Sequence, residues 1–207
     1  VELGSVATLQ NGYAFKSEWF TARGQRLLRN ANVGHGSLRW DDTVYIPEER
    51  AGDYERFRLQ IGDVVLSLDR PFIVTGTKVA RVREQDVPCL LLQRVGRFQL
   101  QQERILADYL FMWLHSPAFN AQVNPGRSNG VPHISSREVE GVSIYVPSLD
   151  EQRRIVAKVD ELMQQCDALE AALVQGETVK GKLLEAVLAG EVERQGEKKG
   201  ARYKATA

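Results

Sequence analysis

The stretch VPSLDEQRRIVAKVDELMQQCDALEAAL, Val146–Leu173, contains no glycine and only one proline, Pro147, and it predicts one long helix. Ser148 and Glu151 have the spacing of a capping box, so the helix is expected to begin at Ser148. At about 1.5 Å per residue, a helix from Ser148 to Ala189 would be roughly 60 Å long. We expect a helix of this length to act as a spacer or a handle rather than to complete the core of the domain before it.

Apolar side chains recur along this helix in two seven-residue series, which alternate at spacings of four and three residues. Such spacing is typical of the a and d positions of a coiled coil. The seam weakens at Gly176 and Lys180 and then recovers. The pattern favours a partner helix, and the alternative is a single amphipathic helix that folds back on its own domain. The predicted helix-interface residues are Ile155, Val159, Leu162, Cys166, Leu169, Leu173, Leu183 and Val187.

The chain before Pro147 is predicted to be mostly β, which makes the protein α+β: short apolar runs alternate with turn residues. A hairpin is expected around Gly34–Gly36, because glycine tolerates positive φ, and a turn at 62–63 should precede a buried strand. In residues 76–84, apolar and polar side chains alternate with the period of two that is typical of a strand. One strand is expected over 88–100, followed by a polar turn, and another strand is expected in 143–147.

Two helical segments should interrupt the β pattern. Residues 107–123 carry an apolar face at helical spacing that is broken at Ser116-Pro117. Ser135 and Glu138 have capping-box spacing and predict a brief helix.

The 27 basic and 27 acidic residues cancel, so the sequence has no overall basic signature of nucleic-acid binding. Before Pro147, however, 15 of the 17 basic residues are arginine. Arginine suits guanine edges and phosphates, although a GC-rich genome would produce the same bias. Cys89 and Cys166 lack CxxC spacing, which fits a reducing cytoplasm and argues against a disulfide scaffold or a zinc site. No apolar run is long enough to span a membrane.

Motifs of catalysis are missing from the sequence. It has no phosphate-binding loop, no HExxH zinc motif and no GxSxG nucleophile elbow, and its three histidines show no paired spacing. Asn124-Pro125-Gly126 lacks the second proline and the aromatic residue of an amino-methyltransferase motif. We therefore predict no catalytic residue and no bound metal.

Polar side chains in several loops have the chemistry of DNA recognition, since Arg, Asn, Gln and Lys read base edges and hold phosphates. One such loop presents Asp69 and Arg70 directly after a strand. Each loop taken singly is explained as well by solvation. The candidate DNA-binding residues are Asn11, Tyr13, Lys16, Arg29, Asn30, Arg70, Lys78, Gln93, Arg94, Arg127, Asn129 and His133.

Seven motifs, taken in order, resemble one half of a Type I restriction-modification specificity subunit. The most specific is VPSLDEQRRIVAKVDEL, although the family usually has a paired proline where this chain has Pro147-Ser148. The other six motifs are LGSVATLQNGYAFKS, LLRNANVGHG, GDVVLSLD, LLLQRV, YLFMWLHSPAF and GVPHIS.

The resemblance implies a DNA target recognition domain at 1–147 and a conserved spacer and dimerisation helix at 148–190. The polar composition of 191–207 predicts a mobile tail. Whole family members have two such units, whose helices pack antiparallel and whose domains each read one half of a bipartite target. This chain would be half of a longer subunit, or a short subunit that dimerises.

The resemblance also implies the partners, which are double-stranded DNA, the modification (methyltransferase) subunits and, through the complex, the restriction subunit. S-adenosylmethionine, ATP and Mg would bind these partner subunits, and the chain itself would hold no cofactor and catalyse no reaction. The alternative is a protein-interaction adaptor that dimerises through its C-terminal helix. A standalone nuclease or methyltransferase is disfavoured because its motifs are missing.

Overall fold

The structure is a computed structural model of the 207-residue chain, and it describes residues 1–123, 126–128, 131–188, 192–195 and 202–205. The chain divides into two compact units, Val1–Val156 and Ala157–Ala207. No helix in the described residues is long and apolar enough to cross a membrane.

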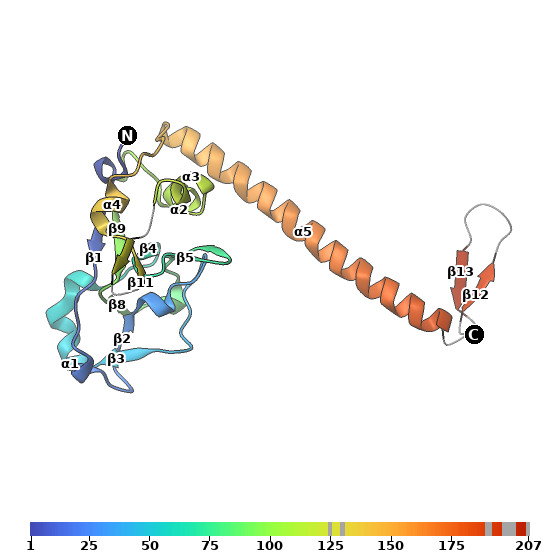
Figure 1. Ribbon diagram of the computed structural model, residues 1–207, viewed down its shortest axis with the longest axis horizontal. Coiled ribbons are helices and arrows are strands. Elements are labelled where there is room, and N and C mark those ends of the chain that lie inside the picture. Colours follow the sequence, from blue (N-terminus) through green and yellow to red (C-terminus); the bar gives the residue numbers. More distant parts are fainter. Residues whose placement is uncertain (124–125, 129–130, 189–191, 196–201, 206–207) are drawn as a thin grey trace. The chain divides into compact units, whose positions relative to one another are not determined.

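The first unit is built around two sheets, as the mostly β prediction requires (Figure 1). A four-stranded antiparallel sheet has the order β1-β9-β4-β7. A three-stranded sheet has the order β3-β2-β8, with β2 antiparallel to β3 and parallel to β8. The strands of the two sheets are β1 (Ala7–Asn11), β2 (Gln25–Leu28), β3 (Val44–Ile46), β4 (Val64–Ser67), β7 (Val79–Arg81), β8 (Cys89–Leu91) and β9 (Val95–Leu100).

Short antiparallel pairs and helices complete the chain. The pairs are β5 (Phe72–Ile73) with β6 (Gly76–Thr77), β10 (Gly126–Ser128) with β11 (Val131–His133), and β12 (Val192–Gln195) with β13 (Arg202–Ala205). The α-helices are α1 (Glu48–Ala51), α2 (Ala107–Leu114), α3 (Pro117–Asn120), α4 (Ser136–Glu140) and α5 (Leu149–Leu188). The 3-10 helices are η1 (Leu3–Ser5), η2 (Ser17–Trp19), η3 (Asn30–Asn32), η4 (Gly52–Phe57) and η5 (Glu84–Asp86).

Several of the predicted local features are present in the structure. Gly62 adopts the positive φ of 92° expected for the turn before β4. The 107–123 segment breaks into α2 and α3, and the Ser116 hydroxyl accepts a hydrogen bond from the Phe119 N–H at the start of α3. Ser135 and Glu138 form a reciprocal capping box on α4.

The chain turns at Gly34–Gly36 as expected, with a positive φ of 81° at Gly36, but the two strands of the expected hairpin do not form. Strand β2 pairs with β3 and β8, and the loop after it holds only an isolated bridge between Val33 and Leu38. The reason is a buried side chain: the Asn32 amide donates to the carbonyl oxygens of Arg39 and Asp42, at 2.9 and 3.0 Å. Side-chain bonds of this kind replace a strand ladder.

Two further strand predictions need correction. The 88–100 segment forms two strands in different sheets, because the chain turns at Gln93-Arg94 between β8 and β9. The 143–147 segment forms no strand beyond an isolated bridge at Ser143. There the Tyr145 carbonyl oxygen accepts a hydrogen bond from the Tyr109 hydroxyl at 2.8 Å instead of from a neighbouring strand.

The start of α5 belongs to the core of the first unit. Gln152 is fully buried, its side-chain oxygen accepts from the Leu106 N–H, and its amide donates to the carbonyl oxygens of Arg104 and Pro147. Ile155 and Val156 pack against the same apolar cluster. The first two turns of the helix therefore contribute to this core, and Ile155, a predicted helix-interface residue, is half-buried against it.

The predicted seam is solvent-exposed in the second unit, where α5 runs on from Ala157 to Leu188. Leu169 and Leu173 are 65% and 71% exposed, and Val159 is half-buried. The segment expected to be a mobile polar tail contains β12 and β13, which pair with each other. The exposed apolar residues of α5 are Leu162, Met163, Leu169, Leu173, Val174, Val179, Leu183, Leu184, Val187 and Leu188.

Replacing Gln152 should destabilise the first unit. Gln152→Ala leaves one N–H and two carbonyl groups in the core without their partner, and we expect a loss of about 2–4 kcal/mol in the free energy of unfolding. The measurement is urea unfolding of the full chain. The matched control is Gln165→Ala on the exposed part of α5, which should change stability by less than about 0.5 kcal/mol. Equal losses in the two variants would contradict the anchoring role of Gln152.

Candidate nucleic-acid interface

One end of the four-stranded sheet gathers loops from distant parts of the sequence. In the register, Asn11 pairs with Gly96, Ser67 with Val95, and Leu66 with Val79. The last residues of β1 and β4 therefore lie beside the first residues of β9 and β7, because antiparallel neighbours bring opposite ends together. The loops that follow β1 and β4 and precede β9 meet at this edge.

Backbone hydrogen bonds hold these loops together. The Gly12 N–H donates to the Val95 carbonyl, and the Gln93 N–H donates to the Tyr13 carbonyl, at 3.0 and 2.9 Å. A Cβ at Gly12 would lie 2.2 Å from the Leu92 carbonyl oxygen, so this approach requires glycine. The loop after β1 is thereby fixed against the turn between β8 and β9.

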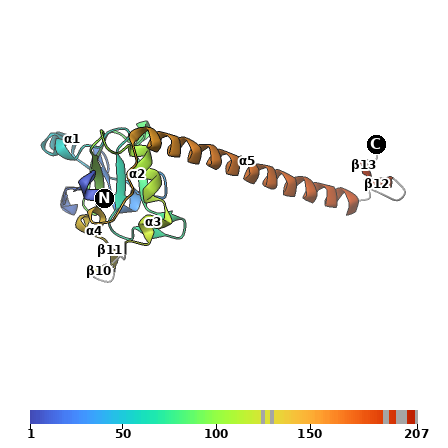
Figure 2. The ribbon, with the colours of Figure 1, turned by 90° about the horizontal axis from the view of Figure 1, so that it is seen from above.

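Strand β11 joins this end of the sheet through the chain that follows β4. The Arg70 N–H donates to the Pro132 carbonyl at 2.7 Å, and the Ile134 N–H donates to the Leu68 carbonyl at 2.9 Å. Figure 2 shows β10 and β11 as a hairpin that projects from the domain near α4. These bonds place His133 opposite Asp69.

A polar cluster of Asp69, His133 and Arg94 forms at this junction. The Nδ1 atom of His133 lies 2.7 Å from Asp69 Oδ1, and Arg94 Nη1 lies 3.7 Å from the same oxygen. The side chains of Asp69 and His133 are 21% and 24% exposed, and that of Arg94 is 47% exposed. The cluster is therefore fixed by the fold and still reachable from solvent.

Two members of the cluster, Arg94 and His133, line a hollow of about 310 Å³ at the loop ends. Four of the predicted DNA-binding residues meet there: Asn11, Gln93, Arg94 and His133. Six of the nine residues that line the hollow have polar side chains. The whole lining comprises Asn11, Gly12, Ala14, Leu68, Gln93, Arg94, His133, Ser135 and Ser136.

Two arginines beside the hollow have left-handed backbone conformations. Arg70 has φ 47° and Arg94 has φ 71°, and both are exposed. Positive φ at residues other than glycine costs of order 1–3 kcal/mol and is concentrated at functional sites. The fold accepts this cost in the loop after β4 and in the turn before β9, and both arginines reach solvent.

Lys78 lies at the same end of the sheet, but it is not the surface contact that was predicted. It is 8% exposed, and its ammonium group donates to the Asn30 carbonyl oxygen. Burial, and secondarily the nearby Arg70, lowers the pKa of Lys78 below its ordinary value, with Asp69 acting in the opposite direction. Lys78 and Asn30 thus tie β7 to η3.

Three other predicted contacts have structural partners away from the hollow. The Arg29 guanidinium bonds Asp42 at 2.7 Å. The Tyr13 ring packs against Phe15, Tyr54 and Phe57, with its centroid 5.0, 4.7 and 5.5 Å from theirs. Exposed Lys16 lies over the Trp19 ring beside η2.

The two remaining predicted contacts belong to the hairpin that carries His133. Arg127 lies in β10, and the structure does not describe its side chain. Asn129 is outside the described residues. Asp69 was not among the predicted contacts. Its position directly after a buried strand could have identified it as part of the site, because loops that follow strands often carry binding residues.

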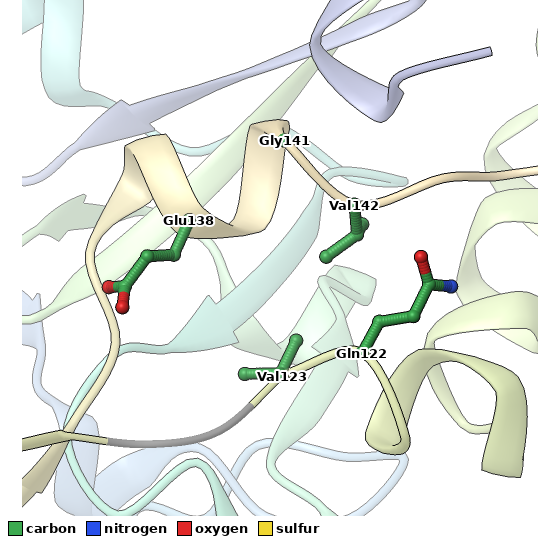
Figure 3. A pocket seen from close by; sticks show the side chains of 5 residues that line it. All are labelled: Gln122, Val123, Glu138, Gly141 and Val142. Atoms are coloured by element: carbon green, nitrogen blue, oxygen red, sulfur yellow. The ribbon is translucent and has the colours of Figure 1, made fainter.

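A second hollow, of about 430 Å³, lies between the chain after α3 and α4 (Figure 3). Its Gln122 amide already bonds the backbone of Ser143, accepting at 2.7 Å and donating at 2.9 Å. Hydrogen bonds from Ser135 lower the pKa of Glu138, whose carboxylate points away from Val123 and Val142. These polar groups hold α4 in place, so we assign this hollow a structural role.

Comparison with known proteins gives consistent matches. The profile of the family "Type I restriction modification DNA specificity domain" matches residues 1–175. The EcoAI specificity subunit of Escherichia coli, a Type I restriction enzyme subunit, is 49% identical over 167 residues, which cover 81% of this chain and 28% of the relative. The MjaVIII specificity subunit of Methanocaldococcus jannaschii is 30% identical and covers 93% of this chain and 45% of the relative. The chain thus spans less than half the length of these relatives.

A solved structure has the same fold. The HsdS subunit from Thermoanaerobacter tengcongensis aligns with a TM-score of 0.64 at 23% identity. The alignment covers 91% of this chain and 43% of that chain, and so extends into α5.

Burial of Lys78 predicts a specific dependence of stability on pH. Because its pKa is lowered in the folded chain, the unfolded chain binds more protons between that lowered value and 10.5, and stability rises with pH across this window. Lys78→Met removes this dependence. In urea unfolding, the wild type should therefore gain stability relative to the variant as the pH is raised from about 7 to about 10. Lys180→Met, at an exposed position on α5, should track the wild type, and a constant difference for Lys78→Met would be evidence against burial of the charge.

Proposed function

Because this chain belongs to the family of Type I restriction-modification DNA specificity domains, we propose that it reads one half of a bipartite DNA target and contributes no catalytic group. The observation that carries the proposal is the gathering of Asn11, Gln93, Arg94 and His133 around one hollow at the end of the sheet. The sequence alone distributes these residues over three distant loops. The fold is consistent with a single recognition surface.

The residues of this surface have complementary chemistry. Arginine binds the O6 and N7 atoms of guanine with two hydrogen bonds, and asparagine or glutamine binds the N6 and N7 atoms of adenine in the same way. Arg94, Gln93 and Asn11 are exposed and supply these groups. Arg70, beside them, is suited to a phosphate, which positions the protein without reading sequence.

The zero net charge of the chain is compatible with this role. DNA affinity depends strongly on phosphate neutralisation, and an assembled complex supplies it from several subunits. We expect the isolated chain to bind duplex DNA weakly and its affinity to fall as salt rises.

The exposed seam of α5 is assigned to assembly. From Leu162 onward, the leucine and valine side chains of this helix are 40% or more exposed, and the exposure of so much apolar surface to water is unfavourable. Packing against a second helix would bury that surface. We propose that this helix comes from a second specificity unit, because the relatives are more than twice as long as the matched segment. That unit is a second half of the same subunit or a second copy of this chain.

The remaining partners follow from the family. The modification subunits would dock on the helical region and carry S-adenosylmethionine, and the restriction subunit would use ATP and Mg. Their DNA substrate places the complex in the cytoplasm. The competing function is a protein adaptor that uses the same helix and does not bind DNA, and the two predictions that follow separate it from the specificity role.

Removing Arg94 should weaken DNA binding more than removing a comparable arginine elsewhere. If Arg94 contributes a bidentate base contact of about 1–3 kcal/mol, Arg94→Ala should lower affinity for the target about 5- to 100-fold. The measurement is binding of the full chain to duplexes carrying its preferred sequence, over a series of salt concentrations. Arg23→Ala, an exposed arginine before β2, is the matched control. An adaptor would bind no duplex, alone or mixed with a modification subunit.

Charges placed on the seam should abolish assembly without unfolding the domain. Leu162→Asp with Leu169→Asp is expected to remove self-association or modification-subunit binding, because the new carboxylates would be buried in the helix interface. Size in solution and co-purification are the readouts. Gln164→Asp with Ala171→Asp adds the same charges on the opposite face of α5 and serves as control. If both pairs assemble like the wild type, the seam is not the interface.

A further inference from the structure

We propose that His133 reads the exocyclic amino group of one target base, adenine N6 or cytosine N4, and that Asp69 is the positioning residue that gives His133 this preference. The inference rests on the proposed function and deepens it by naming a base chemistry. It is carried by the geometry of the Asp69–His133–Arg94 cluster.

The contact with Asp69 sets the tautomer of His133. A carboxylate only accepts hydrogen bonds, so the Nδ1 atom at 2.7 Å from Asp69 Oδ1 must carry the proton. In the neutral ring the other nitrogen, Nε2, is then an acceptor. A fixed acceptor selects a donor, and in the major groove the base donors are the adenine N6 and cytosine N4 amino groups.

The backbone holds both members of the pair. The Ser67 hydroxyl donates to the Asp69 carbonyl oxygen at 2.7 Å, and the Arg70 N–H donates to the Pro132 carbonyl at 2.7 Å. On the other side of His133, Ile134 is fully buried and its N–H donates to Leu68. The imidazole is thus fixed at its base while remaining partly exposed, which is the preorganisation that selective contacts require.

Arg94 lies against the face of the ring rather than on one nitrogen. Its Nη1 atom is 3.4 Å from His133 Nδ1 and 3.5 Å from Nε2. A donor in the ring plane cannot be equally close to both nitrogens, because it would collide with the Cε1 atom between them. The Nη1 atom of Arg94 therefore lies over the face of the imidazole, and it does not occupy the in-plane position from which a base would donate to Nε2.

A purely structural role is the competing explanation. In that case the pair would only join the end of β4 to β11, and its loss would weaken all binding and lower stability without altering base preference. The proposal instead requires that loss of the pair changes the preferred base at one position of the target and leaves the preferred bases at the other positions unchanged. Base preference is therefore the decisive readout.

The test is selection of bound sequences from a randomised duplex pool by the full chain. For the wild type we expect one position that requires adenine or cytosine, and His133→Ala should lose the preference there alone. Asp69→Asn, whose amide can donate to Nδ1 and free Nε2 to carry the proton, should shift that position toward the carbonyl bases guanine or thymine. Asp69→Glu retains a carboxylate and should retain the wild-type preference. Arg23→Ala is again the control.

A synthetic duplex then isolates the amino group. Replacing the selected base by the same base without its amino group should weaken the wild type about 5- to 100-fold and leave His133→Ala unaffected. If the wild type and His133→Ala enrich the same sequence at every position, the inference is overturned and the proposed function stays intact. Enrichment of no sequence by the wild type would overturn both.

Discussion

The buried amide of Gln152 is the constraint on which the arrangement of this chain depends. Its side chain satisfies two backbone groups in the loop before α2 and one at Pro147, so the first turns of α5 are part of the domain that precedes them. A buried polar network must be fully satisfied to be stable, which makes this junction sensitive to its geometry. Ile155 and Val156 extend the junction with apolar packing. The first turns of the helix are therefore joined to the preceding domain by a defined contact as well as by the chain.

Strand register determines the arrangement of the loops around the hollow at the end of the four-stranded sheet. Because β9 lies between β1 and β4, the turn that opens β9 meets the loops that close its two neighbours. Residues more than eighty positions apart in sequence thereby line one hollow. Loops held on a rigid sheet are a common location for binding residues. Here the positive φ values of Arg70 and Arg94 show that the backbone itself is shaped to present these loops.

Recognition and assembly are assigned to different kinds of surface. The sheet end offers polar side chains fixed by hydrogen bonds, which suits discrimination between bases, and the seam of α5 offers apolar side chains, which suits association with another helix. In a bipartite reader the distance between two half-sites depends on a rigid connection. Under the proposed function, the buried Gln152 would fix the first turns of α5 to the domain that reads one half-site.

The sequence by itself determined the local features: the capping box at Ser135, the hydroxyl cap at Ser148, the break at Ser116-Pro117, and the heptad series of α5. Such signals depend on neighbours within a few residues, as does the ordered set of motifs that resembles the specificity family. Only the tertiary structure decided which polar residues face solvent. Arg94 and Lys78 are both basic residues in or next to predicted strands, yet the fold exposes Arg94 and buries Lys78 against η3. Arg29 forms an ion pair with Asp42. Burial and pairing depend on contacts between distant strands, and residue type does not encode those contacts.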